Sequence, residues 1–329
     1  MAKRAMITGI SGQDGSYLAE HLLGLGYEVW GLVRDPDRPV GARIAHLADE
    51  IPLVRGDLLD GESLVAAVER VRPDELYNLA AISFVPTPWR DVELMNDVNG
   101  AGVLRLLEAV RVVCGLEPGT APAPGGIRFY QASSSEMFGA ATQTPQHEAT
   151  PFHPRSPYGV TKVYGHLLTR NYRESLGLYG VSGILFNHES PRRGTEFVTR
   201  KITLAAAEIK LGRRDRLRLG SLDARRDWGF AGDYVRAMHL MLQQDRPDDY
   251  VVGTGRTHTV EDVVRIAFET VGLHWHDHVA VDPGLVRPTE TLPLCADPTR
   301  ARTELGWRPS VEFADLIRMM VEADLRRLR

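Results

Sequence analysis

Short apolar segments alternate along the chain with segments of helical periodicity. The apolar segments have the length and composition of strands that are buried on both faces, and the expected strands are residues 4–8, 28–33, 51–55, 75–79, 127–132 and 181–186. Between and after them, apolar positions recur at helical spacing; we expect helices over residues 17–23, 62–71, 96–113, 233–243 and 310–328, and another beginning near residue 158. This alternation predicts an α/β fold built on a doubly wound parallel sheet.

Composition and charge narrow the class of protein. The 329 residues carry a net charge of −4, without a basic face or tail, which argues against nucleic acid as a partner. No signal peptide, membrane span or lipidation motif is recognisable, so we expect a cytoplasmic protein without a membrane partner. The two cysteines, Cys114 and Cys295, are expected to be free thiols. His274, His276 and His278 alternate, but they lack a neighbouring carboxylate cluster, so we expect no metal site.

A glycine-rich segment follows the first expected strand and leads into the first helix. Gly9, Gly12 and Gly15 form a G-x-x-G-x-x-G pattern there. Glycines let the backbone turn sharply and approach a pyrophosphate, whose charge the N-terminus of the helix stabilises. In this strand–loop–helix context the pattern predicts a Rossmann-type dinucleotide-binding domain.

A second group of chemically active residues follows the fifth expected strand. Ser134 and Glu136 lie at its carboxyl end, where open α/β sheets bind ligands. Pro154 and Pro157 disfavour helix up to that point, so Tyr158 and Lys162 should share one face of a helix that begins near Tyr158. A nearby ammonium favours the phenolate, and we therefore expect Lys162 to lower the pKa of Tyr158. The alternative is a surface Tyr and Lys on an ordinary helix, which the preceding hydroxyl cluster argues against.

These residues resemble the extended short-chain dehydrogenase/reductase superfamily. The resemblance implies that Tyr158 is the catalytic acid/base and that Lys162 tunes it and holds the nicotinamide ribose. The spacing of Ser134 and Glu136 resembles that of nucleotide-sugar dehydratases, because epimerases usually lack the acid. Asn187-His188-Glu189-Ser190-Pro191-Arg192-Arg193-Gly194 is more specific still, and it resembles the signature of the GDP-mannose 4,6-dehydratase family.

The resemblance extends over nearly the whole chain and assigns the candidate site residue by residue. It implies the catalytic residues Ser134, Glu136, Tyr158 and Lys162. It implies cofactor contacts by Gly9, Gly12, Gln13, Asp14, Gly15, Arg34, Asp57, Leu58, Leu79, Ala80, Ala81, Ser83, Tyr158, Lys162, His188 and Arg193. It implies substrate contacts by Ser83, Ser134, Glu136, Asn187, Val198, Lys201, Arg226, Arg287 and Glu290. Ser134 stands where better-known members have Thr, and Leu94 where they tend to have Tyr.

The end of the second strand bears on the choice of cofactor. Arg34 can hold an adenosine 2′-phosphate, whereas an acidic residue there would bond the 2′-hydroxyl of NAD. The resemblance favours NADP, because Arg34 matches the first of two arginines in the dehydratase pattern. The second position is Asp35, which departs from that pattern. The alternative for Arg34 is a solvated loop residue.

The resemblance thus implies a dehydratase that converts GDP-mannose to GDP-4-keto-6-deoxymannose through NADP. The alternatives are a GDP-4-keto-6-deoxymannose reductase, which needs Tyr158 and Lys162 but not Glu136, and a non-catalytic NADP-sensing Rossmann protein. We expect a Rossmann domain over residues 1–186, with a returning segment at about 226–250. A smaller C-terminal α/β substrate lobe should comprise residues 187–225 and 251–329. By analogy, the chain should form a homodimer or a homotetramer.

Overall fold

A seven-stranded parallel sheet forms the centre of the computed structural model, which describes residues 2–38, 41–83, 88–119, 125–285 and 293–329. The strand order is β11-β6-β5-β4-β1-β2-β3. The strands are β1 (Arg4–Thr8), β2 (Glu28–Val33), β3 (Leu53–Arg55), β4 (Glu75–Asn78), β5 (Arg128–Ser134), β6 (Gly180–Leu185) and β11 (Asp249–Val252). The predicted doubly wound parallel sheet is confirmed, because all six pairings between these neighbours are parallel.

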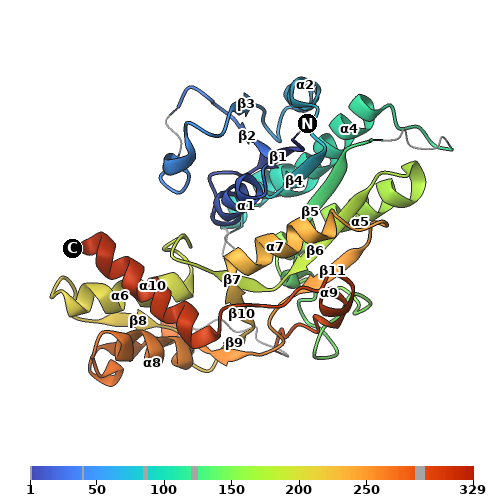
Figure 1. Cartoon of the computed structure of the whole chain (residues 1–329). Helices are drawn as coiled ribbons and strands as arrows, with labels where there is room; N and C mark the ends of the chain where they lie inside the picture. Colours follow the sequence, from blue (N-terminus) through green and yellow to red (C-terminus); the bar gives the residue numbers. More distant parts are fainter. Residues whose placement is uncertain (1, 39–40, 84–87, 120–124, 286–292) are drawn as a thin grey trace.

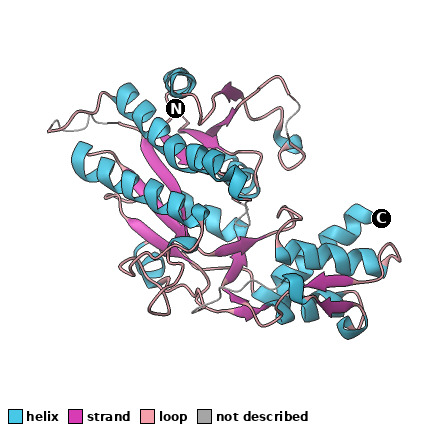
Figure 2. Ribbon diagram, turned by 180° about the vertical axis from the view of Figure 1, so that it is seen from behind, coloured by secondary structure: helices cyan, strands magenta, loops and turns pink. Residues whose placement is uncertain are grey.

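Helices cover both faces of this sheet (Figure 1, Figure 2). On one face, α1 (Gln13–Gly24) packs beside α7 (Ala231–Met241), and their apolar residues share a core with Tyr77 and Val181 of the sheet. On the other face, α2 (Gly61–Val71), α4 (Gly102–Cys114) and α5 (Pro157–Leu176) bury a second core. The strands are apolar on both faces because each face lies under a helical layer.

A smaller lobe lies beyond the carboxyl ends of the strands (Figure 1). Its core joins α6 (Val198–Lys210), α8 (Val260–Thr270) and α10 (Phe313–Leu328) to β8 (Leu217–Leu219) and Trp228. Its other elements are β7 (Asn187–Glu189), β9 (Arg225–Arg226), β10 (Trp228–Phe230), β12 (His258–Thr259) and β13 (Val279–Val281). Helix α9 (Thr299–Glu304) packs instead beside β11 of the large sheet. No helix among the described residues is both long enough and apolar enough to cross a membrane.

The helix predicted over residues 96–113 is interrupted. It consists of α3 (Val92–Asn96), a π-helical turn over Asp97–Ala101 and then α4. The wide turn contains Asn99, whose side chain accepts a hydrogen bond from the Ile82 N–H at 2.8 Å and donates one to the Ile82 carbonyl at 2.9 Å. The irregular turn thus fixes the loop after β4, one of the loops expected to hold the cofactor.

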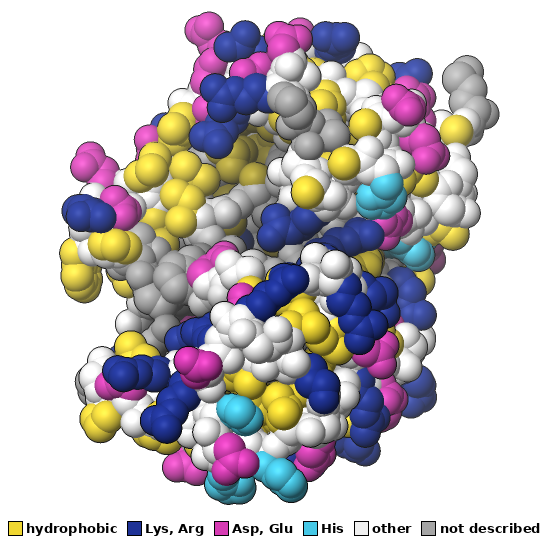
Figure 3. Space-filling view, turned by 90° about the vertical axis from the view of Figure 1, so that its left-hand side faces the viewer, with side chains coloured by type: hydrophobic (Ala, Val, Ile, Leu, Met, Phe, Trp, Pro, Cys, Tyr) yellow, Lys and Arg dark blue, Asp and Glu magenta, His cyan; other side chains and the backbone are white. Residues whose placement is uncertain are grey.

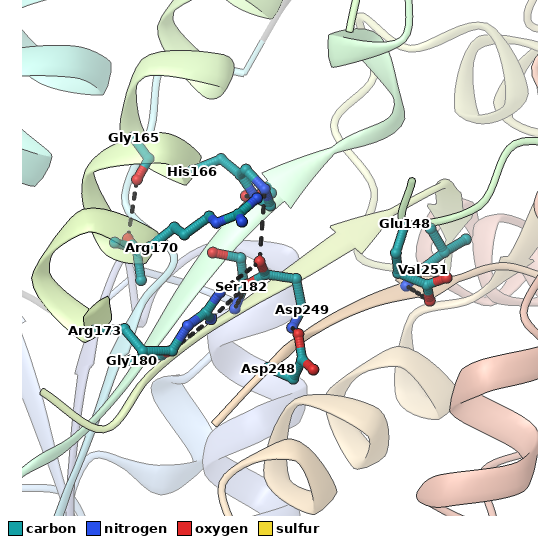
Figure 4. Close-up of polar contacts among 12 residues, drawn as sticks. Glu148, Gly165, His166, Arg170, Arg173, Gly180, Ser182, Asp248, Asp249 and Val251 are labelled. Atoms are coloured by element: carbon teal, nitrogen blue, oxygen red, sulfur yellow. Dashed lines mark hydrogen bonds and ion pairs between the residues drawn. The ribbon is translucent and has the colours of Figure 1, made fainter. Parts of the chain in front are cut away.

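A buried ion pair fixes α5 against the sheet. The guanidinium of Arg173 donates to both carboxylate oxygens of Asp249 at 3.0 and 2.9 Å, and the Ser182 N–H donates to the same carboxylate at 3.1 Å (Figure 4). His166 lies on the same side, with its Nδ1 3.2 Å from the hydroxyl of Ser133. Because α5 also carries Tyr158 and Lys162, these contacts set the position of the helix that carries the candidate catalytic pair.

Candidate active site

A cleft of about 1700 Å³ runs along the carboxyl ends of β1, β2, β4, β5 and β6 and extends to the lobe. In a view of one side of the molecule, Lys and Arg side chains gather over the lower part, and hydrophobic side chains lie above a hollow (Figure 3). Every predicted site residue that the structure describes lines this cleft. Arg287 and Glu290 lie outside the described residues.

The glycine loop has the geometry that a dinucleotide requires. Gly9 adopts φ +69°, and a Cβ there would lie 2.8 Å from the backbone N of Ala80. A Cβ on Gly15 would lie 2.3 Å from the carbonyl oxygen of Gly9, so this position admits no side chain. Helix α1 begins directly after Gly12, and no side chain caps its first N–H groups. The loop therefore fits a pyrophosphate held by backbone N–H groups.

The side chains of Gln13 and Asp14 are engaged by the protein. The Asp14 carboxylate lies 2.8 Å from Nε2 of His188, and the Gln13 amide donates to the carbonyl oxygen of His188 at 3.1 Å. The hydroxyl of Ser190 donates to Oε1 of Gln13 at 2.8 Å. These two residues therefore connect the loop to the segment that follows β6.

The candidate catalytic residues meet where β5 ends beside α5. The hydroxyl of Ser156 caps α5 by accepting from the Gly159 N–H at 3.0 Å, which places Tyr158 and Lys162 in its first two turns, both buried. The Lys162 ammonium donates to the carbonyl oxygen of Ala132 at 2.9 Å. The Ser134 hydroxyl accepts from the Glu136 N–H at 3.2 Å, so the strand ends in a tight turn that carries Glu136 into the cleft.

The prediction that Lys162 lowers the pKa of Tyr158 is wrong. Burial raises the pKa of Tyr158 well above its ordinary value, and the charge of Glu136 raises it further, although a hydrogen bond with Ser134 opposes the shift. The Lys162 Nζ is directed toward Ala132 and lies 5.6 Å from the centre of the Tyr158 ring. Burial also lowers the pKa of Lys162, to about 8. Desolvation thus outweighs the expected attraction between phenolate and ammonium.

The segment after β6 contributes residues from the other side of the cleft. Arg193 forms an ion pair with Glu189 at 3.2 Å and stacks over the ring of Phe197 at 3.5 Å. In the lobe, the Lys201 ammonium donates to the carbonyl oxygen of Arg218 at 3.0 Å. Arg226 lies on β9, and its guanidinium donates to the carbonyl oxygen of Arg225 at 2.7 Å. Cationic side chains thus line the part of the cleft that the lobe forms.

The structure adds cleft residues that the sequence did not indicate. Arg155 is exposed, lines the cleft and has no hydrogen-bond or ion-pair partner within the described part of the chain. A Cβ on Gly139 would lie 2.9 Å from the backbone N of Arg155, so the backbone around Arg155 is tightly packed. The position of Arg155 between Pro154 and Pro157 is a sequence signal that could have indicated Arg155 as a cleft residue. Arg38 also lines the cleft and pairs with Asp35 at 3.0 Å.

No group of three or more His, Cys, Asp or Glu side chains that could hold a metal ion occurs among the described residues. His274 and His278 flank a short 3-10 turn that contains His276 (Trp275–Asp277), on the side of the lobe near β13. The ionisable side chains that line the cleft include Glu136, Tyr158 and Lys162.

An open parallel sheet with this glycine loop, a Tyr–Lys pair on the helix after β5 and a carboxylate at the end of β5 define an extended short-chain dehydrogenase/reductase. The family model described as GDP-mannose 4,6 dehydratase matches residues 6–320. The chain belongs to the GDP-mannose 4,6-dehydratase family.

Individual relatives agree with this assignment. The chain is 51% identical to GDP-mannose 4,6 dehydratase 1 of Arabidopsis thaliana, over 98% of this chain and 90% of that protein. It is 46% identical to the human GDP-mannose 4,6 dehydratase, over 99% and 92% of the two chains. Among solved structures, it resembles the UDP-glucose 4-epimerase of Thermus thermophilus in complex with NAD. That structure has a TM-score of 0.82 and 28% identity, and the match covers 98% of both chains.

Proposed function

We propose that the protein is a nucleotide-sugar dehydratase, a hydro-lyase that converts GDP-mannose to GDP-4-keto-6-deoxymannose and water with NADP as its cofactor. The observation that carries this proposal is Glu136, held at the end of β5 in the same cleft as Tyr158 and Lys162. A reductase of the same fold needs the Tyr–Lys pair but no such acid. The family match over residues 6–320 supports the dehydratase, and neither the reductase nor a non-catalytic cofactor sensor is favoured.

Each residue has a role in this reaction. Gly9, Gly15 and Lys162 would hold the nicotinamide cofactor, which would supply the redox chemistry that lets a hydride leave C4 of the hexose and return to C6. Tyr158 takes the proton of the hexose O4 as C4 becomes a ketone, and Lys162 orients it and stabilises the phenolate. The ketone acidifies the hydrogen on C5, which Glu136 removes. Glu136, with the Ser134 hydroxyl beside it, then delivers this proton to the departing C6 hydroxyl, which leaves as water. When C6 regains a hydride, C5 must regain a proton, and the proton that Tyr158 took from O4 balances that step.

Substrate choice tests the proposal. We expect GDP-mannose to yield a product lighter by the mass of one water, whereas dTDP-glucose, UDP-glucose and CDP-glucose remain unchanged. The physical reason is the set of residues after β6 that match the family pattern. Of these, Asn187, Arg193 and Lys201 line the cleft. Mass spectrometry of the panel after incubation with NADP is the measurement. Turnover of dTDP-glucose with a comparable kcat/KM would contradict the proposal.

The preference for NADP over NAD is proposed to depend on Arg34, which is exposed at the end of β2 and lines the cleft. A charge-assisted hydrogen bond to the 2′-phosphate is worth about 1.5–3 kcal/mol. Arg34→Ala should therefore erase most of a roughly tenfold to hundredfold preference. Titration of both cofactors against wild type and variant tests this, with Arg70→Ala on α2 as a surface control. Equal wild-type affinity for NAD and NADP would show that Arg34 does not select the cofactor.

A homodimer or homotetramer is proposed from the exposed apolar positions of α5. Val160, Tyr164 and Leu167 recur at helical spacing and are 54, 44 and 48% exposed, and Leu94 on α3 is 50% exposed. Burying such a stripe against a second chain would remove it from water. Sedimentation equilibrium tests the proposal, and a monomer at micromolar concentration would contradict it.

The proposed compartment is the cytoplasm. Cys114 and Cys295 are both free thiols, and burial raises the pKa of Cys295 to about 11, which suppresses its reactive thiolate. Free thiols suit a reducing compartment. Fractionation of source cells tests this, and recovery of the protein outside the cytoplasmic fraction would contradict it.

A further inference from the structure

His188 and Asp14 form a partly buried pair at the cofactor loop, although 174 residues separate them in the sequence. Their side chains are 11 and 24% exposed. Nδ1 of His188 lies 2.8 Å from the carbonyl oxygen of Phe186, which can only accept a hydrogen bond, so Nδ1 carries a proton. Nε2 lies 2.8 Å from a carboxylate oxygen of Asp14. Two acceptors on the two ring nitrogens indicate an imidazolium paired with a carboxylate.

The electrostatic environment agrees with this assignment. Burial favours the neutral imidazole, but the charge and hydrogen bond of Asp14 outweigh it and raise the pKa of His188. Burial likewise disfavours the Asp14 carboxylate, but His188 outweighs it and lowers the pKa of Asp14. The His188 ring also stacks on Tyr234 of α7, with ring centres 4.6 Å apart. The other titratable groups that face the pair are Arg193 and Glu189 after β6, Tyr130 on β5, and Tyr158 and Lys162 on α5.

The position of the Asp14 carboxylate means that its pairing with His188 affects how the loop can bind a pyrophosphate. Asp14 lies in the first turn of α1, the helix whose uncapped N-terminus fits a pyrophosphate. An uncompensated negative charge there would repel the pyrophosphate, whereas the imidazolium cancels it. Gln13 donates to Asp14 at 3.0 Å and to the carbonyl oxygen of His188 at 3.1 Å, which holds the pair rigidly against the loop.

We propose that His188, as an imidazolium, is a positioning residue that neutralises Asp14 and thereby keeps the glycine loop competent to bind the dinucleotide pyrophosphate. This inference rests on the proposed cofactor but not on the proposed substrate. Because the folded pKa of His188 is raised, the stabilising pair is complete below the ordinary pKa of histidine and is lost as pH rises through the folded value. Cofactor affinity should therefore decline on the alkaline side.

The test is a double-mutant cycle read by NADPH fluorescence titration, without turnover. His188→Gln keeps a hydrogen-bond donor but lacks the charge, and it should weaken NADPH binding about tenfold to a hundredfold at neutral pH. Asp14→Asn removes the negative charge that His188 neutralises. The NADPH affinity of the double variant should therefore lie within about threefold of that of Asp14→Asn alone. Failure of Asp14→Asn to rescue His188→Gln would overturn the inference.

The pH dependence supplies an independent arm. Between about pH 7 and pH 9.5, NADPH affinity of the wild type should fall more steeply than that of Asp14→Asn. Because Asp14 also raises the pKa of Lys162, direct titration of the His188 ring by NMR distinguishes the two groups. His46→Gln is the matched control, because His46 pairs with Glu20 on the same helix at 2.5 Å but is half exposed. It should bind NADPH as the wild type does. Equal pH slopes for wild type and Asp14→Asn would contradict the inference.

If His188→Gln fails to fold, NMR of the ligand-free protein still tests the inference. The His188 ring should remain an imidazolium above the ordinary histidine pKa in the wild type, and its pKa should fall in Asp14→Asn. Titration of His188 at its ordinary value in the wild type would overturn the inference. The substrate proposal fails separately: a protein that passes these tests but leaves GDP-mannose unchanged keeps the inference and loses the proposed reaction.

Discussion

Replacement of Glu136 by Gln is expected to lower the overall turnover of GDP-mannose by at least about a hundredfold, because a positioned acid/base group contributes about 10²–10⁴ in rate. Glutamine keeps the shape and the hydrogen-bonding capacity of the side chain, but it cannot accept the C5 proton. GDP-mannose should therefore bind normally. The backbone turn should survive as well, because it depends on the Glu136 N–H bonded to Ser134.

The variant should stop after the first oxidation. The Glu136 charge raises the pKa of Tyr158, so its removal eases the loss of the phenolic proton and leaves the first step intact. The absorbance of reduced cofactor should accumulate in a single turnover, and exchange of the C5 hydrogen with deuterated solvent should disappear. Glu322→Gln on α10 is the control and should retain wild-type turnover. Release of the 4-keto-6-deoxy product by Glu136→Gln at a near wild-type rate would assign the carboxylate a structural role.

Periodicity and chemistry along the sequence are sufficient to predict the sheet and most of the site. Each of the six predicted strands lies within two residues of the observed bounds at either end. A parallel sheet brings the carboxyl ends of its strands to one edge. The loops after β1, β2, β4, β5 and β6 therefore converge, which explains why the described candidate residues line one cleft.

Other features depend on contacts between distant segments. The edge strand β11 (Asp249–Val252) has only four residues, and it is fixed by pairing with β6 and by the bond between Asp249 and Arg173. The pattern predicts the last helix from Ser310, but it begins at Phe313 without a side-chain cap. The Ser310 hydroxyl instead donates to Asp233 at 2.6 Å, on a different helix. No local pattern contains these partners.

The electrostatics of the site also depend on burial, which spacing does not reveal. A Tyr and a Lys four residues apart predict a lowered tyrosine pKa, yet both side chains are almost fully enclosed, and desolvation dominates both groups. The sequence likewise did not reveal that Asp14 and His188 form a pair, because each residue was matched separately to a cofactor contact. In the structure, each compensates the charge of the other.

Tyr158→Phe is expected to slow the first oxidation itself so strongly that no reduced cofactor accumulates on the time scale of a wild-type single turnover. Without the phenolic oxygen, no group removes the O4 proton as C4 is oxidised, and we expect a loss of about 10²–10⁴ in the rate of this step. The fold should persist, because the Tyr158 ring is buried beside Lys162 and Phe fills the same space. Tyr164→Phe, on the exposed side of the same helix, is the control.

The comparison with Glu136→Gln makes the result diagnostic. Tyr158→Phe should give neither reduced cofactor nor exchange at C5, whereas Glu136→Gln should give reduced cofactor without exchange. Reduced cofactor formed by Tyr158→Phe at the wild-type rate would mean that another group is the base. The Ser134 hydroxyl, which hydrogen-bonds with Tyr158, would then be the next residue to replace. An oxidation that requires Tyr158 and an elimination that requires Glu136 are the two separable steps of a dehydratase, and a reductase would lack the second.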